Sequence, residues 1–246
     1  MIDKKTSFYT IDIGNTRTKV GCFQNDVLKS VNTLDHTELE YFLIETVQNE
    51  YSIISSVEKS SFLDGITNKW RPTIMLSSTI DLPISLEQYN SLDTLGVDRI
   101  ANVVASHFYS KKNAPSLVID IGTCIKYDVI DAKSNYLGGA ISPGVQMRFS
   151  SMHQFTARLP LITDYEFNSL IGNSTKQSMQ SGVLNGIKAE LNGIISAYKE
   201  KFSGISIFLT GGDLKLFDKA LKNDIFVDQN LTLKGLYLIL KHHVQK

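Results

Sequence analysis

The fold of this chain is decided by a short acidic turn, Asp12-Ile13-Gly14-Asn15-Thr16, which returns 108 residues later as Asp120-Ile121-Gly122-Thr123-Cys124. In each copy an apolar run precedes the turn and a second strand-like run follows it, which is typical of a β-hairpin. The glycine permits a tight turn and lets an anion approach the backbone N–H groups closely. The aspartate is then a candidate Mg²⁺ ligand, directly or through water, and the threonine hydroxyl a candidate partner for a phosphate oxygen.

The repetition of the turn carries more weight than either copy, because a single Asp-x-Gly-Asn turn is ordinary hairpin chemistry. The spacing equals the size of one small domain, so we infer an internal duplication. Apolar periodicity predicts an α/β fold of two domains, residues 1–114 and 115–246, each with a mixed sheet in the order β-β-β-α-β-α-β-α. The helices expected from this periodicity cover residues 35–48, 60–70, 98–109, 174–202, 213–221 and 232–244.

Composition describes an ordinary globular protein and excludes several classes. The 246 residues are 42% hydrophobic, enough for a substantial core, and 25 basic residues balance 25 acidic ones. No overall basic field is present to attract nucleic acid or an anionic membrane. No apolar run approaches the ~20 residues of a membrane span, and the first residues lack the apolar region of a signal peptide. We therefore expect a cytoplasmic protein with no nucleic-acid or membrane partner.

A third glycine site, Thr210-Gly211-Gly212-Asp213, follows a buried strand and precedes an expected helix. Exposed N–H groups at the start of a helix favour anions. Taken alone, the site is interpreted equally well as a left-handed turn followed by an aspartate N-cap. The chain contains neither a Walker A sequence nor Gly-x-Gly-x-x-Gly, so the other common nucleotide sites are unsupported.

Together the two turns and the third site resemble the phosphate and adenosine motifs of the actin, Hsp70 and sugar-kinase superfamily, in which paired ribonuclease-H-like domains bind ATP. Within that superfamily the chain resembles the type III pantothenate kinases along nearly its whole length. The matching segments, in order, are Asp12-Ile13-Gly14-Asn15-Thr16-Arg17-Thr18-Lys19, Tyr89 with Gly96-Val97-Asp98-Arg99, Val118-Ile119-Asp120-Ile121-Gly122-Thr123, and Gly138-Gly139-Ala140-Ile141-Ser142-Pro143-Gly144.

The resemblance implies an actin-like, homodimeric enzyme that phosphorylates the primary hydroxyl of pantothenate with ATP, the first step of coenzyme A biosynthesis. It implies ATP-binding residues Asp12, Ile13, Gly14, Asn15, Thr16, Arg17, Thr18, Lys19, Thr123, Gly211 and Gly212, and substrate-binding residues Tyr89, Gly96, Val97, Asp98, Arg99 and Thr175. Asp98 would be the general base, a role that suits a carboxylate beside the attacking hydroxyl. Arg99 would bind the substrate carboxylate. Asp12 would hold Mg²⁺, and Asp120 would help bind a monovalent cation, K⁺ or NH₄⁺.

Other interpretations stay open. Without the resemblance, the residues favour Asp98 as an N-cap with Arg99 as a surface cation, and Asp120 as a residue that satisfies its own turn. Lys126 departs from the family pattern, which has a small hydroxyl or apolar residue there, and the departure bears on cation or nucleotide affinity. The alternative functions are a kinase for another small polyol or sugar, and a non-catalytic regulator with the same fold. The intact acidic turns argue against the regulator.

Overall fold

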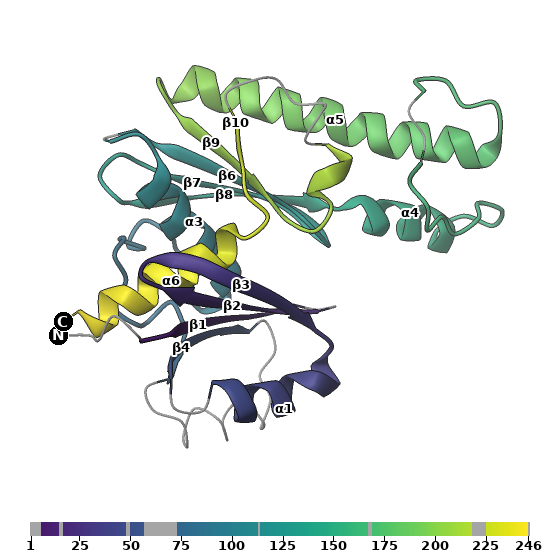
Figure 1. Ribbon diagram of the computed structural model, residues 1–246. Coiled ribbons are helices and arrows are strands. Elements are labelled where there is room, and N and C mark those ends of the chain that lie inside the picture. The colour runs from purple at the N-terminus through teal and green to yellow at the C-terminus, as the bar shows by residue number, and fades with distance from the viewer. Residues whose placement is uncertain are drawn as a thin grey trace. The chain divides into compact units, whose positions relative to one another are not determined.

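The computed structural model describes residues 6–14, 17–47, 50–56, 73–112, 114–166, 169–217 and 225–245, which form two five-stranded sheets and the helices around them (Figure 1). The first sheet contains β1 (Phe8–Ile13), β2 (Thr18–Gln24), β3 (Val27–Leu34), β4 (Tyr51–Ser56) and β5 (Thr73–Met75). The second contains β6 (Ser116–Ile121), β7 (Cys124–Ile130), β8 (Tyr136–Pro143), β9 (Ser206–Thr210) and β10 (Ile225–Val227). The helices are α1 (His36–Thr46), α3 (Val97–Tyr109), α4 (Val145–Gln154), α5 (Thr175–Lys201) and α6 (Leu231–Val244).

The two sheets have the same strand order, β3-β2-β1-β4-β5 in the first and β8-β7-β6-β9-β10 in the second. In each sheet the central strand is antiparallel to the strand that follows it in the chain and parallel to its other neighbour. Each acidic turn therefore lies at the end of a central strand, with a neighbouring strand on both sides. The predicted α/β class with two mixed sheets is confirmed.

The two faces of β1 are covered by different helices, as the alternation of side chains along a strand requires. Ile11 and Ile13 belong to a buried cluster with Leu39 and Leu43 of α1. Phe8 points to the other face, where its ring contacts the ring of Tyr237 in α6 with 5.7 Å between centroids. Asp12 is four residues after Phe8 on the same strand, so its side chain lies on the same face of the sheet, the face that α6 covers.

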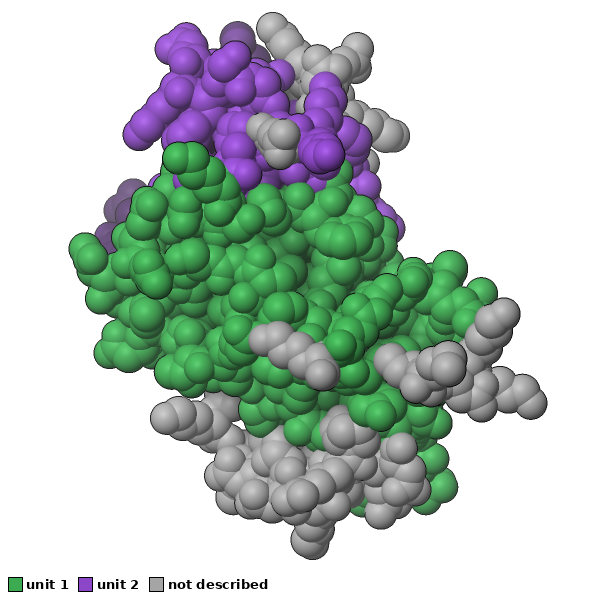
Figure 2. Space-filling view, turned by 90° about the vertical axis from the view of Figure 1, so that its left-hand side faces the viewer, with its two compact units in different colours: residues 1–109, 133–137, 230–246 green, residues 110–132, 138–229 purple. Residues whose placement is uncertain are grey.

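The chain divides into two compact units, residues 1–109, 133–137 and 230–246 in the first and residues 110–132 and 138–229 in the second (Figure 2). The last helix groups with the first unit because α6 packs on α3 and on β1. The expected division between residues 114 and 115 stays a prediction.

The expected helices at 35–48, 98–109, 174–202 and 232–244 are present as α1, α3, α5 and α6. The expected helix at 60–70 lies outside the described residues. The helix expected at 213–221 is wrong over its described part, where a 3₁₀ helix runs from Leu214 to Leu216. Leu214 and Phe217 are both buried, and their spacing of three residues matches the period of a 3₁₀ helix. Residues 218–221 lie outside the described residues.

Close packing between α3 and α6 depends on Gly235, because a Cβ there would lie 1.8 Å from the carbonyl oxygen of Ala101. We expect Gly235→Ala to lower the free energy of unfolding by about 1–3 kcal/mol, the usual cost of overpacking. Gly193→Ala in α5 is the matched control, because a Cβ there meets nothing within 4 Å. The control should raise stability by about 0.5–1 kcal/mol through helix propensity. Urea unfolding measures the change in the free energy of unfolding of each variant. Equal changes in the two variants would contradict the packing argument.

Candidate active site

The first acidic turn places Asp12 between two polar neighbours at the end of β1. Lys19 on β2 lies directly opposite Asp12, and Ser55 on β4 lies beside it in parallel register. The Ser55 hydroxyl donates to Asp12 Oδ1 at 3.2 Å, which fixes the orientation of the half-buried carboxylate. The N–H of Gly14 donates to the carbonyl of Arg17 at 3.1 Å and closes the turn.

The other residues proposed for this turn differ in exposure. Ile13 is part of the apolar core. Thr18 is fully buried, and its hydroxyl has no hydrogen-bond partner among the described residues. Arg17 is exposed and Lys19 half-buried. Asn15 and Thr16 lie outside the described residues, so their proposed contacts with nucleotide stay predictions.

The second acidic turn repeats this arrangement. Asp120 at the end of β6 lies opposite Lys126 on β7 and beside Thr210 on β9. The Lys126 ammonium is 2.8 Å from Asp120 Oδ2. In both units an aspartate thus lies between a hydroxyl residue on the parallel neighbour and a lysine on the antiparallel neighbour. Asp120 therefore forms an ion pair with a residue outside its own turn. The interpretation in which Asp120 only satisfies its own turn did not predict this partner.

Three glycine segments that are distant in sequence meet at the second turn. A Cβ on Gly144 would lie 2.1 Å from the carbonyl oxygen of Gly122. Gly211 has a φ of +108°, and a Cβ there would lie 2.2 Å from the carbonyl oxygen of Ile121. The N–H of Asp213 donates to that same oxygen at 2.9 Å. The third glycine site and the second turn are therefore in direct backbone contact.

Gly212 lies at this junction and is exposed, with nothing within 4 Å of the position of a Cβ. A ligand can therefore approach its backbone closely, which is the usual function of glycine in nucleotide sites. Burial raises the pKa of the neighbouring Asp213 carboxyl above its ordinary value.

The proposed substrate residues near α3 form a compact group in the first unit. Asp98 lies in the first turn of α3, which begins at Val97, and its Oδ1 accepts from the N–H of Arg99 at 2.9 Å. A Cβ on Gly96 would lie 2.6 Å from the same Oδ1. Gly96 therefore leaves room for the Asp98 carboxylate at the start of the helix, and Asp98 lies inside the helix and not at its cap.

Arg99 is not a surface cation, because only 6% of it is exposed. Its Nη1 donates to the hydroxyl of Tyr89 at 3.4 Å. Its guanidinium carbon lies 5.8 Å from the centroid of the Tyr89 ring and 6.0 Å from that of Tyr136, distances at which an aromatic face attracts a cation. Sequence reasoning assigned Tyr136 to the sheet, where it lies, but missed this contact, because strand periodicity carries no signal of a cation 37 residues away.

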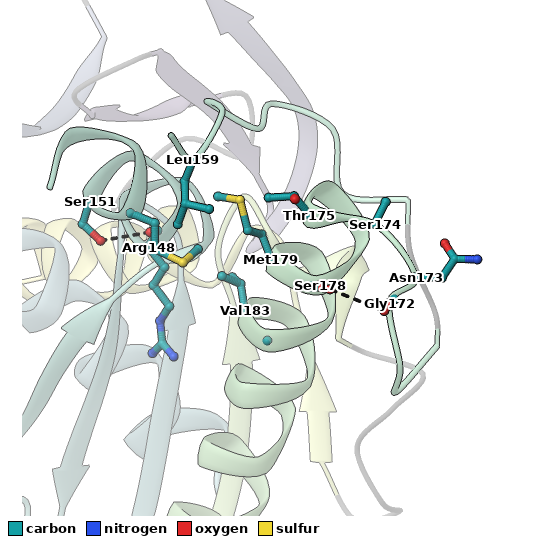
Figure 3. A pocket seen from close by; sticks show the side chains of 12 residues that line it. Arg148, Ser151, Leu159, Gly172, Asn173, Ser174, Thr175, Ser178, Met179 and Val183 are labelled. Atoms are coloured by element: carbon teal, nitrogen blue, oxygen red, sulfur yellow. Dashed lines mark hydrogen bonds between the residues drawn. The ribbon is translucent and has the colours of Figure 1, made fainter. Parts of the chain in front are cut away.

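Thr175 belongs to the second unit, at the first turn of α5. Its helix is capped by Ser174, whose hydroxyl accepts from the N–H of Gln177 at 3.3 Å. Between α4 and α5 is a hollow of about 820 Å³ (Figure 3). The side chains of Leu159, Met179 and Val183 line it, and Thr175 contributes a hydroxyl to its wall.

A polar network connects α5 to the sheet and to α4, and sequence analysis missed it. Glu190 of α5 accepts hydrogen bonds from Tyr127, Ser142 and Arg148. Burial alone would raise the pKa of Glu190, but these three donors outweigh it and lower the pKa below its ordinary value. Burial and the Glu190 carboxylate both raise the pKa of Tyr127. The network fixes the middle of the helix that begins at Thr175.

Comparison with solved structures identifies the fold. A glucokinase from an Antarctic psychrotroph has the same fold, with a TM-score of 0.54 and 10% identity over 96% of this chain and 99% of that one. A protein from Campylobacter jejuni described as a Baf family transcriptional activator has a TM-score of 0.64 and 22% identity over 97% and 100%. At these identities the similarity shows the fold alone, which is that of the actin-like ATPases and sugar kinases.

The family follows from closer relatives. The family model for type III pantothenate kinases matches residues 8–197. The type III pantothenate kinase of Christiangramia forsetii is 44% identical over 94% of this chain and 96% of its own length, and that of Flavobacterium johnsoniae is 39% identical over 92% and 94%. The chain belongs to the type III pantothenate kinase family and is a kinase, as its motifs predicted.

Proposed function

We propose that this chain transfers the terminal phosphoryl group of ATP to the primary hydroxyl of pantothenate, the first step of coenzyme A biosynthesis. The observation that carries the proposal is the match to pantothenate kinases over nearly the full length. It is supported by the contacts that Asp98 and Tyr89 make with Arg99 near the start of α3. A buried guanidinium beside an acidic side chain suits a substrate with a carboxylate at one end and a hydroxyl at the other.

In this proposal Asp98 accepts the proton of the attacking hydroxyl, and Arg99 binds the carboxylate of pantothenate. The Tyr89 hydroxyl and ring hold the guanidinium in place, and Thr175 positions the substrate. Phosphoryl transfer depends mainly on alignment and on neutralising charge, so a carboxylate is a sufficient base.

The two acidic turns would bind the nucleotide. Gly14, Thr123 and Gly212 offer backbone or hydroxyl groups to phosphate oxygens, and Lys19 a positive charge. Mg²⁺ is usually held by one or two carboxylates together with substrate phosphates and water. The part of the chain that the structure describes holds no cluster of three His, Cys, Asp or Glu side chains. A single carboxylate seated by a hydroxyl, as Asp12 is by Ser55, fits such an ion, which would neutralise phosphate charge when bound.

Asp120 is the residue for which the resemblance implies K⁺ or NH₄⁺. In this chain its carboxylate already forms an ion pair with the Lys126 ammonium. A positive charge beside Asp120 would assist phosphoryl transfer by offsetting the charge of the phosphate groups.

We also propose that the chain forms a homodimer through the second unit. Large apolar side chains are exposed on and around α4 and before α5: Ile141, Met147, Phe155, Leu161, Leu170 and Ile171. Such side chains gathered on one segment of a monomer favour burial against a protein partner. Sedimentation velocity of the wild type and of Phe155→Asp tests this, because the variant should sediment as a monomer. None of the described helices could cross a membrane, and the cytoplasmic location stays a prediction.

The proposed reaction is tested by ATP consumption with pantothenate and Mg²⁺, beside a panel of sugars and polyols. Turnover with pantothenate supports the proposal. Turnover only with another alcohol would keep the nucleotide site and assign the chain a different substrate. ATP binding without turnover on any alcohol would favour a regulator.

A further inference from the structure

The ion pair between Lys126 and Asp120 lies on the second sheet beside the junction of the three glycine segments. Only 19% of the Lys126 side chain and 15% of the Asp120 side chain are exposed. The pair faces away from α5, because Tyr127, the next residue on β7, contacts Glu190 of that helix. Both strands of the pair are held in the sheet, with β6 between β7 and β9. The lysine side chain is therefore largely buried and held in place by Asp120, unlike a lysine on the surface.

The residues present do not fit a separate monovalent cation at Asp120. A K⁺ or NH₄⁺ ion would need the carboxylate oxygens as ligands, and Lys126 Nζ already lies 2.8 Å from Oδ2. A second positive charge at the same carboxylate would be repelled, and the repulsion is strong where water is largely excluded. An alkylammonium carries the same charge as NH₄⁺ and donates the same kind of hydrogen bond.

We propose that the Lys126 ammonium is a tethered replacement for the monovalent cation, so that this kinase needs neither K⁺ nor NH₄⁺. The inference rests on the proposed function. The side chain holds one positive charge beside the Gly122–Thr123 turn, where phosphate charge develops during transfer. A covalently attached charge is present at any salt composition, which a dissociable ion is not.

The first test measures the rate of pantothenate phosphorylation in KCl, NH₄Cl and NaCl at equal ionic strength. The wild-type rate should be the same in all three salts. Lys126→Ala removes the ammonium and leaves room at Asp120, so its rate should fall about tenfold or more in NaCl and recover in KCl or NH₄Cl. Lys126→Met removes the charge but fills the space, so its rate should fall without recovery.

A second readout is independent of turnover. The melting temperature of Lys126→Ala should rise in KCl relative to NaCl, and Asp120→Asn in the same background should abolish that rise. Lys199→Ala is the control, because Lys199 is exposed near the end of α5, and it should behave as the wild type in every salt. The melting temperatures also show whether each Lys126 variant is folded.

Two results would overturn the inference while leaving the kinase intact. One is a wild-type rate that rises about tenfold from NaCl to KCl. The other is a Lys126→Ala variant that K⁺ does not rescue and whose KM for ATP is raised, which would make Lys126 a direct nucleotide contact. An absence of pantothenate turnover by the wild type in every salt would instead overturn the proposed function.

Discussion

Asp98→Asn should lower kcat for pantothenate phosphorylation by about 10²- to 10⁴-fold, the usual contribution of a general base. The amide is nearly isosteric with the carboxylate and can still accept from the N–H of Arg99, so the start of α3 should be preserved. Affinity for ATP should not change, because the loss concerns the proton of the attacking hydroxyl. Steady-state kinetics and titration calorimetry with ATP measure the two quantities.

The control for this variant is Asp93→Asn. Asp93 is an exposed carboxylate in the 3₁₀ helix Leu92–Thr94, just before α3, and its replacement should leave kcat unchanged. If Asp98→Asn retained more than about a tenth of the wild-type kcat, Asp98 would be a structural residue and the base would have to be sought elsewhere.

Arg99→Met should raise the KM for pantothenate by about 10- to 100-fold with a smaller change in kcat, because a charge-assisted hydrogen bond to the substrate carboxylate is lost. Methionine keeps an unbranched apolar stem beside the rings of Tyr89 and Tyr136 while removing the donors. Arg99→Lys keeps the charge but not the planar fork, and we expect an intermediate KM. Thermal unfolding verifies that each variant is folded.

A second substrate separates carboxylate recognition from a general loss of packing. The primary amide of pantothenate lacks the negative charge, so the wild type should prefer the acid and Arg99→Met should lose that preference. A variant that still prefers the acid over the amide by the wild-type factor would show that Arg99 does not bind the carboxylate.

Local features of the sequence were sufficient to predict the two hairpins and most helices. An aspartate and a glycine between two apolar runs specify a turn through backbone chemistry alone, and the same pattern at Asp12 and Asp120 predicted two similar sheets. The helix at 174–202 was visible because apolar residues recur at its period over many turns. Where the apolar pattern was short, as after Asp213, packing against the rest of the fold determined the local structure, and the described part of the expected helix is the 3₁₀ helix Leu214–Leu216.

Pairing across strands could not be predicted by comparing the two turns. Counting from each aspartate aligns Lys126 with Thr18, yet the structure places Lys126 opposite Asp120 as Lys19 is opposite Asp12. The two turns differ in length by one residue, and a change of one residue alters which side chain opposes the aspartate. The sequence shows that Lys126 differs from the family pattern. Only the strand register shows that Lys126 lies opposite Asp120.

The sequence by itself determined the class of fold and the family, because these follow from local turn chemistry and the order of motifs. Only the tertiary structure placed the Arg99 guanidinium beside the paired rings of Tyr89 and Tyr136, brought Gly144 and Gly211 to the second turn, and joined Lys126 to Asp120. These contacts depend on which strands and helices pack together, and that choice is made by burial and close packing over the whole chain and not by any short segment.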